Sequence, residues 1–232
     1  MREIVLDTET TGLDPYQGHR LVEIGCIELV NRFPSGKVFH KYLNPERDMP
    51  AEAFNVHGLS AEFLRDKPFF HEVCEELVEF IGDAPLVAHN ANFDLGFLNA
   101  ELERCKKVMI GRERLVDTLL LARRRHPGGP NGLDALCQRY GIDNSRRTKH
   151  GALLDAELLA EVYIEMIGGR QASLTLVEAG RATMATGARA IVVQQRPVAL
   201  PARLSDAELE AHTAFIATLG EKAIWREYDA RT

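Results

Sequence analysis

The segment EIVLDTETTG, residues 3–12, decides the fold. Its first half is an apolar run typical of a β-strand, yet it continues into two carboxylates, Asp7 and Glu9, two residues apart. Because side chains on a strand alternate between its two faces, both carboxylates point to the same face as Val5. At the edge of a core, two such carboxylates repel each other unless a proton or a cation lies between them. The segment therefore predicts a buried strand whose end holds a cation or a proton between the two carboxylates.

The remainder of the first 170 residues alternates between strand and helix patterns. Apolar runs bounded by Gly, Pro and Asn predict strands at residues 3–9, 21–30, 37–45 and 85–90. Apolar residues at helical spacing predict helices at residues 59–67, 71–82, 93–105, 116–125, 132–141 and 151–169. Ser60 and Asn92 are the predicted N-caps of the first and third of these helices. Strands flanked by helices predict the α/β class with a mixed sheet.

Composition and charge restrict the classes of protein to which the chain belongs. With 232 residues, 45% of them hydrophobic and 27% charged, it has the make-up of a globular protein with one sizeable core. Because its net charge is −6, the protein as a whole does not attract a polyanion, and binding one requires a local basic patch or a partner protein. The four cysteines lack C-x-x-C spacing, which predicts free thiols in a reducing compartment. Without a signal-peptide pattern or a membrane-length apolar run, we expect a cytoplasmic protein with no membrane contact.

Two further carboxylates and one histidine lie in positions that need a partner. Asp155 shares a helical stripe with the apolar Leu159 and Val162, so its carboxylate is expected inside the protein. Asp94 lies in the first turn of its helix, where it serves either as a metal ligand or as a cap favoured by the helix dipole. His150 lies on the loop before the last of these helices. Its side chain is either solvated or lies next to the group that Asp155 binds.

Together these residues make a set of hard oxygen ligands with one titratable base. Oxygen ligands without thiolates suit Mg²⁺ or Mn²⁺ rather than zinc. Two such ions about 3.5–4 Å apart would neutralise the acids and hold the attacking and leaving oxygens of a phosphoryl displacement. The sequence therefore predicts a site for two divalent cations beside His150, made by Asp7, Glu9, Asp94 and Asp155.

A family resemblance rests on three short motifs. DTETTG at residues 7–12, HNANFD at 89–94 and HGALLD at 150–155 resemble the exonuclease motifs of the DEDD superfamily, in its histidine-bearing branch. The resemblance implies a ribonuclease H-like fold over residues 1–170 and a metal-dependent 3′–5′ exonuclease activity. It assigns the four acids as metal ligands and His150 as the base that activates a water molecule.

Residues near these motifs are candidates for holding the substrate. In the family, the segment that contains Thr10 contacts the 3′ end, and the stretches that contain His57, Asn90 and Phe93 lie beside the active site. Each residue could instead have a purely structural role, because Thr10 is typical of a turn and the other three are typical of packing or capping positions. The basic run RRTKH at residues 146–150 adjoins the catalytic histidine, so we expect phosphate contacts there.

The sequence changes character after residue 170. Residues 171–203, rich in Ala, Gly and Thr, predict a flexible linker. The linker begins with QASLTL, which resembles the short clamp-binding motif of bacterial replication proteins, with Gln171, Leu174 and Leu176 as its anchors. The motif therefore implies a sliding clamp as a partner.

A second helical element follows the linker. Residues 204–220 begin with the capping-box spacing of Ser205 and Glu208 and are too short to form a core of their own. We expect the tail, residues 204–232, to fold against another protein, or otherwise to pack back on the exonuclease domain, residues 1–170. An exonuclease with such a tail resembles the proofreading exonucleases of bacterial replicative polymerases. This resemblance implies a nucleoid-associated protein whose partners are a DNA 3′ end and the polymerase (alpha) subunit.

Two other functions fit the same residues. One is a DEDD 3′–5′ exonuclease that acts on RNA, since the catalytic residues alone do not separate DNA from RNA. The long tail argues against it, because such enzymes are little more than the nuclease domain. The other is a non-catalytic subunit that braces a polymerase, but a brace has no physical reason to keep four mutually repelling acids.

Overall fold

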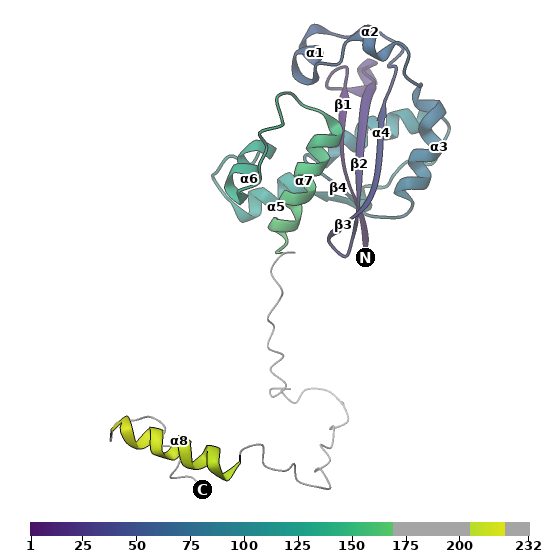
Figure 1. Ribbon diagram of the computed structural model, residues 1–232. Helices are drawn as coiled ribbons and strands as arrows, with labels where there is room; N and C mark the ends of the chain where they lie inside the picture. The colour runs from purple at the N-terminus through teal and green to yellow at the C-terminus, as the bar shows by residue number, and fades with distance from the viewer. Residues whose placement is uncertain (169–204, 221–232) are drawn as a thin grey trace, which may run out of the picture. The chain divides into compact units, whose positions relative to one another are not determined.

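The computed structural model describes residues 1–168 and 205–220. Residues 1–168 contain a five-stranded sheet with the strand order β3-β2-β1-β4-β5 (Figure 1). The strands are β1 (Arg2–Thr10), β2 (Leu21–Val30), β3 (Phe33–Tyr42), β4 (Leu86–Ala88) and β5 (Leu115–Asp117). Strands β1, β2 and β3 are antiparallel, whereas β4 and β5 run parallel to β1. The predicted α/β class with a mixed sheet is confirmed.

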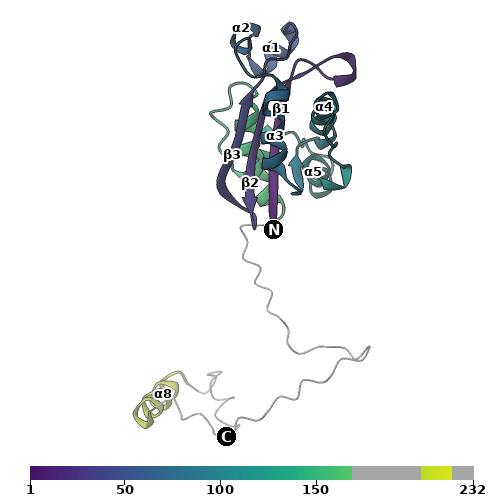
Figure 2. The ribbon, with the colours of Figure 1, turned by 90° about the vertical axis from the view of Figure 1, so that its right-hand side faces the viewer.

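Helices cover both faces of this sheet (Figures 1 and 2). They are η1 (Pro15–Gln17), α1 (Ala51–His57), α2 (Ala61–Leu64), α3 (Phe70–Ile81), α4 (Ala91–Arg104), η2 (Arg112–Arg114), α5 (Thr118–Arg125), α6 (Leu133–Tyr140) and α7 (Ala152–Met166). On one face, α3 and α4 share a core cluster with Ile4 and Leu6 of β1. On the other face, α7 packs against Val5, while α5 and α6 pack against α7. The alternation predicted for β1 therefore holds, and its acidic face is the one that α7 covers.

Gly25 lets the start of α7 lie against the sheet. In β2 it is the register partner of Asp7 in β1. A Cβ atom on Gly25 would lie 2.4 Å from backbone atoms of Ala152 and Leu153. Since only glycine permits this approach, Gly25 allows Asp155, which is in the first turn of α7, to reach the strand that carries Asp7.

Several local features differ from the sequence prediction. Strand β3 spans Phe33–Tyr42 rather than the predicted residues 37–45. The helix predicted to begin at the Asn92 cap instead has its N-cap at Asn90, which adopts the left-handed conformation with φ of 67°. Asparagine tolerates this conformation, so the chain turns directly from β4 into α4. The segment predicted as a helix from residue 116 starts with β5, and its helix begins after Asp117. Helix α1 lies in a segment with no predicted element.

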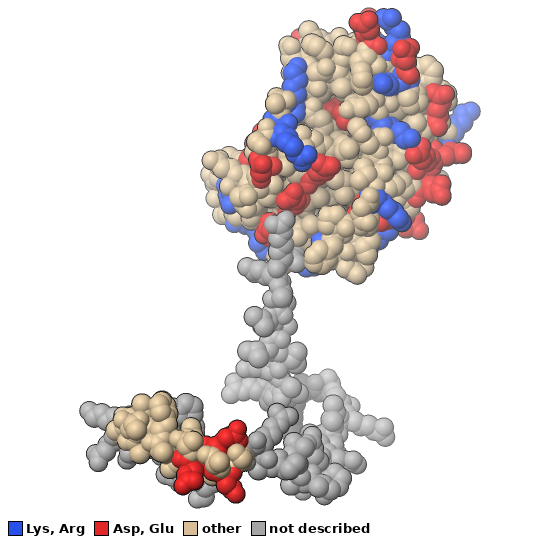
Figure 3. Space-filling view, in the orientation of Figure 1, with Lys and Arg blue, Asp and Glu red and all other residues tan. Residues whose placement is uncertain are grey.

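The second range holds α8 (Asp206–Thr218), which belongs to a separate compact unit of the chain. Ser205 and Glu208 form the predicted capping box, and acidic side chains gather at one end of the helix (Figure 3). Leu209, Phe215 and Leu219 are about half exposed. Gln171, Leu174 and Leu176 of the predicted clamp motif lie outside the described residues.

The prediction of free thiols is confirmed by the structure. All four cysteines are free thiols, as their spacing predicts. On the face of residues 1–168 seen in Figure 3, basic and acidic side chains are interspersed. None of the helices within residues 1–168 and 205–220 is both long and apolar enough to cross a membrane.

Gly25→Ala tests the close approach of α7 to β2. The added Cβ meets backbone atoms that cannot move aside, so the free energy of unfolding should fall by about 1–3 kcal/mol in urea denaturation. Gly96→Ala, inside α4 with no atom within 4 Å of the added Cβ, is the control. It should be neutral or stabilise by up to about 1 kcal/mol, because alanine favours helices. An unchanged stability of Gly25→Ala would contradict this account.

Candidate active site

Two strand carboxylates and one helix carboxylate meet where β1 passes the start of α7. Asp7 and Glu9 share the face of β1 that α7 covers, and Asp155 is buried in the first turn of α7. Ligand atoms of Glu9, His150 and Asp155 all lie within 4.8 Å of one another. His150 is exposed on the loop before α7, and its Nδ1 is 3.5 Å from Oδ2 of Asp155. The structure thus brings residues from two of the three motifs together.

Asp94 joins this group from the opposite face of the sheet. It is buried in the first turn of α4. The hydroxyl of Thr8 points to that face and donates a hydrogen bond to Oδ1 of Asp94 at 2.7 Å. Asp94 is also the neighbouring acid that raises the pKa of Asp7 most strongly. The fourth predicted acid therefore lies within electrostatic range of the strand carboxylates.

Three of the four acids hold a proton more tightly than a free carboxyl group does. Burial first, and then the charges of Asp94, Glu9 and Asp155, raise the pKa of Asp7 well above its usual value. Burial and the nearby Asp155 raise the pKa of Glu9 to about 8. Burial raises the pKa of Asp94 to about 7, although the hydrogen bond from Thr8 opposes it. These acids need added positive charge to be ionised together near neutral pH.

Arg147 brings one positive charge to the site. Its Nε and Nη2 donate to Oδ1 and Oδ2 of Asp155, both at 2.7 Å. Its Nη2 also lies 2.9 Å from Nδ1 of His150. Its Nη1 donates to Oδ2 of Asp134 at 2.8 Å. One guanidinium group therefore contacts both the helix carboxylate and the predicted base.

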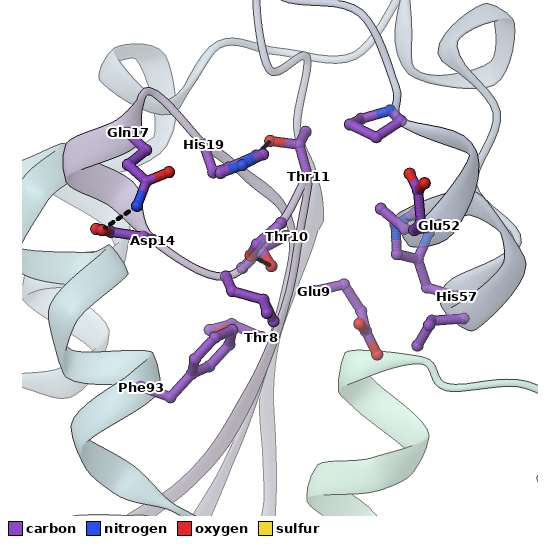
Figure 4. Close-up of a pocket in the computed structure, with 15 residues that line it drawn as sticks. Thr8, Glu9, Thr10, Thr11, Asp14, Gln17, His19, Glu52, His57 and Phe93 are labelled. Carbon is purple, nitrogen blue, oxygen red and sulfur yellow. Dashed lines mark hydrogen bonds between the residues drawn. The ribbon is translucent and has the colours of Figure 1, made fainter.

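A cavity of about 570 Å³ adjoins the acids, with Glu9 and Thr10 of β1, His57 of α1 and Phe93 of α4 in its wall (Figure 4). Within the described residues, the buried Oε1 of Glu9 and Nε2 of His57 have no hydrogen-bond partner. The backbone N–H of Leu59 donates to Nδ1 of His57 at 3.0 Å, so Nε2 carries the hydrogen of the neutral ring. Burial lowers the pKa of His57 and favours that neutral form. The wall of the cavity thus offers polar atoms that a ligand can satisfy.

The residues predicted to hold the substrate differ in their positions. Thr10, His57 and Phe93 line this cavity, whereas Asn90 is exposed at the start of α4 and is not part of its wall. The hydroxyl of Thr10 donates to the carbonyl of Gly12 at 2.6 Å, which is the turn contact of its structural reading. Phe93 also packs against the core, so it belongs to both the core and the cavity.

A second cavity of about 520 Å³ lies against two of the other acids. Asp7 and Asp155 line it, together with His150, Arg147 and Asp134. Because Glu9 lines the first cavity and lies within 4.8 Å of Asp155, the acidic group is situated where the two cavities approach each other. A linear polymer bound in both cavities would therefore lie across this acidic group.

Sequence reasoning missed three residues that build the site. Thr8 lies inside the first motif, so its hydroxyl was available as a signal, but its bond to Asp94 joins residues 86 positions apart. Gly25 carries no local pattern that distinguishes it from other glycines in strands. Asp134 looks like an ordinary acidic residue in the first turn of α6. All three act through contacts across the fold that spacing does not reveal.

The site fits divalent metal ions. The four acids offer hard oxygen donors, which Mg²⁺ and Mn²⁺ prefer. The raised pKa values of Asp7, Glu9 and Asp94 indicate a shortage of positive charge. In addition, the buried Oε1 of Glu9 has no hydrogen-bond partner in the described part of the chain. A divalent ion would satisfy both the charge and this oxygen atom.

Comparison with known proteins identifies the family. A model of the exonuclease family matches residues 4–163, which include all three motifs. The chain therefore belongs to the exonuclease family and is a nuclease. The fold is similar to that of the nuclease domain of 3′hExo, a DEDDh family member bound to rAMP, with a TM-score of 0.61 and 16% identity over 72% of this chain and 92% of that chain. It is also similar to exonuclease X in complex with 5′ overhanging duplex DNA, with a TM-score of 0.56 and 24% identity over 72% and 91% of the two chains.

More similar relatives match nearly the whole chain. DNA polymerase III subunit epsilon of Rickettsia felis is 48% identical over 222 residues, which cover 94% of this chain and 97% of that protein. DNA polymerase III subunit epsilon of Escherichia coli strain K12 is 45% identical over 237 residues, which cover 97% of each chain. The similarity thus extends beyond the exonuclease match at residues 4–163.

The raised pKa of Glu9 predicts how the stability of the metal-free protein depends on pH. Its pKa is about 8 in the folded protein, compared with 4.5 for a free glutamate. Between these values the folded protein binds more protons than the unfolded chain, so the free energy of unfolding falls as pH rises. In chelator, we expect the melting temperature to fall from about pH 5 to about pH 8 and Glu9→Gln to flatten this fall.

Thermal melts of the wild type, Glu9→Gln and the control Glu79→Gln check this prediction. Glu79 lies on the exposed side of α3, so its variant should keep the slope of the wild type. A melting temperature that rises over this pH range, or equal slopes for the wild type and Glu9→Gln, would show that the prediction is wrong.

Proposed function

We propose that the chain is the proofreading 3′–5′ exonuclease of bacterial DNA polymerase III and removes mispaired nucleotides from DNA 3′ ends. The observation that carries the proposal is the cluster of Glu9, His150 and Asp155, with Asp7 and Asp94 in electrostatic range of it, in a chain of the exonuclease family. Relatives named DNA polymerase III subunit epsilon match nearly its whole length, which supports the same function.

In this proposal, the cavity beside Glu9 holds the 3′-terminal nucleotide. The ring of Phe93 offers an apolar surface on which a base can stack. His57 donates a hydrogen bond from its unpartnered Nε2–H to an oxygen atom of that nucleotide. Thr10 contacts the nucleotide from β1, and Asn90 contacts the strand from the start of α4. The basic loop at residues 146–150 meets the phosphates.

The chemical step is hydrolysis of the last phosphodiester bond. His150, solvent-exposed and next to Asp155, accepts a proton from the attacking water, because a neutral imidazole nitrogen within reach of that water can act as a general base. The water oxygen bonds to phosphorus as the bond to the leaving 3′ oxygen breaks. Asp7, Glu9, Asp94 and Asp155 hold two divalent cations, Mg²⁺ or Mn²⁺, which acidify the water and neutralise the charge on the leaving oxygen when bound.

Release of nucleotides from a 3′-mispaired DNA primer tests this function. With Mg²⁺, the full chain should release the mispaired nucleotide faster than it degrades an RNA oligomer of matched length, and chelator should stop the release. His150→Ala should slow it by about 10²–10⁴-fold, the usual contribution of a general base. Asp7→Ala should abolish it because a metal ligand is lost.

His71→Ala is the matched control, because His71 is exposed on α3 and stacks on Phe69, away from the acids. It should leave the rate unchanged. Preference for the RNA oligomer would move the function to an RNA-trimming exonuclease. Failure to hydrolyse either substrate would point to a subunit that only braces a polymerase.

The proposal extends to the tail. Residues 1–170 form the exonuclease domain, residues 171–203 the linker and residues 204–232 the segment that binds the polymerase (alpha) subunit. In the described part of that segment, α8 exposes Leu209, Phe215 and Leu219, which suits burial against a partner. Gln171, Leu174 and Leu176 bind the sliding clamp. These partners place the protein in the bacterial cytoplasm, at the nucleoid.

Deletion of residues 186–232 separates the two proposed partners. The shortened chain keeps the motif at residues 171–176, so it should still bind the clamp and degrade short single strands. It should no longer co-purify with the polymerase subunit, because the tail is absent. Co-purification that survives the deletion would show that the interpretation of the tail is wrong.

A further inference from the structure

Arg147 uses almost every donor of its guanidinium group inside the active site. Two of its nitrogens bind the two oxygens of Asp155 at 2.7 Å, and the third binds Asp134 at 2.8 Å. Nη2 also lies 2.9 Å from His150. The side chain of Arg147 is only 9% exposed and that of Asp155 only 3% exposed. This is a desolvated, bidentate ion pair, a geometry in which arginine binds carboxylates strongly.

The ion pair and a bound metal ion compete for the same atoms. Both carboxylate oxygens of Asp155 accept hydrogen bonds from Arg147, and an oxygen that accepts such a bond in the carboxylate plane is not free to ligate an ion there. A divalent ion that ligated the lone pairs facing Arg147 would displace a guanidinium nitrogen, and one that ligated the other lone pairs would place a second cation against the same carboxylate, beside the charge of Arg147. The same displacement uncovers Nδ1 of His150, which Nη2 of Arg147 now contacts.

Asp134 offers the displaced guanidinium a second anchor. Its side chain is 62% exposed at the rim of the cavity that Asp7, His150 and Asp155 line, and it already binds Nη1. If a metal ion took Asp155 as a ligand, Arg147 could keep this contact at the wall of the same cavity. The charge of Arg147 also acts on the strand carboxylates, because it lowers the pKa of Asp7 and of Glu9 against the effect of burial.

We propose that Arg147 is a resident counter-ion that neutralises Asp155 and covers His150 in the metal-free enzyme and competes with divalent cations for the site. It thereby sets the metal affinity of the enzyme and prevents the uncompensated acids from destabilising the fold before metal binds. This inference rests on the proposed metal-dependent function. Arg147 is a positioning residue, since it acts through Asp155 and His150.

The measurement is the dissociation constant for Mn²⁺ of the full chain, from titration followed by the electron paramagnetic resonance signal of free Mn²⁺. Arg147→Met removes the competing charge at similar side-chain length, so Mn²⁺ should bind roughly tenfold or more tightly, as the loss of a charge-assisted pair implies. In chelator this variant should melt at a lower temperature than the wild type, and Mn²⁺ should raise its melting temperature by more. Arg147→Lys keeps the positive charge but cannot bind both oxygens of Asp155 with two nitrogens. Its dissociation constant for Mn²⁺ should lie between those of the wild type and Arg147→Met.

Arg124→Met is the matched control. Arg124 is an exposed arginine of α5 and lines neither of the two cavities. Its variant should bind Mn²⁺ like the wild type. If Arg147→Met does not fold, the test is the comparison of Arg147→Lys with the wild type, in which the variant should bind Mn²⁺ more tightly.

Two failures are distinguishable. If the wild type binds Mn²⁺ and the Arg147 variants bind it no more tightly, the competition is refuted while the proposed function stands. If neither the wild type nor the variants bind Mn²⁺, both the competition and the metal-dependent function are refuted.

Discussion

The mutual repulsion of four carboxylates is the constraint on which the rest of the structure depends. Asp7 and Glu9 share one face of the central strand, Asp155 faces them from α7, and Asp94 adds its charge from the other side of the sheet. The raised pKa values of the strand acids and of Asp94, which burial causes first and neighbouring acids increase, show that this arrangement is costly without a bound cation. A fold keeps such a cost where function requires it, and the proposed function, to hold metal ions beside a nucleic acid, is one that does.

The surrounding structure serves to hold these acids in place. Gly25 allows the backbone of α7 to reach the sheet, and the hydroxyl of Thr8 orients Asp94. Arg147 supplies a positive charge to Asp155. The backbone N–H of His150 donates to the carbonyl of Val56 at 3.3 Å, which ties the loop before α7 to α1. Because α1 also carries His57, the loop that holds the proposed base and the wall of the proposed nucleotide cavity are mechanically connected.

Much of this arrangement follows from sequence patterns, because it depends on local periodicity. Alternation along β1 places the two acids on one face, helical spacing buries Asp155, and Ser205 with Glu208 caps α8. What the sequence does not reveal depends on contacts between distant segments. The pairing of Arg147 with Asp155 and Asp134 is a matter of loop geometry, and the three residues of β5 are too few to show a period. The left-handed turn at Asn90 explains why the cap lies two residues earlier than expected.

The most direct test of the central claim is an anomalous difference map from a crystal grown with Mn²⁺ and a nucleoside 5′-monophosphate. The account predicts two Mn²⁺ peaks between β1 and the starts of α4 and α7, with oxygens of Asp7, Glu9, Asp94 and Asp155 as ligands and the guanidinium of Arg147 turned away from Asp155. It also predicts the nucleotide in the cavity lined by His57 and Phe93. Peaks that avoid these acids, or a site without Mn²⁺ at saturating concentration, would contradict it.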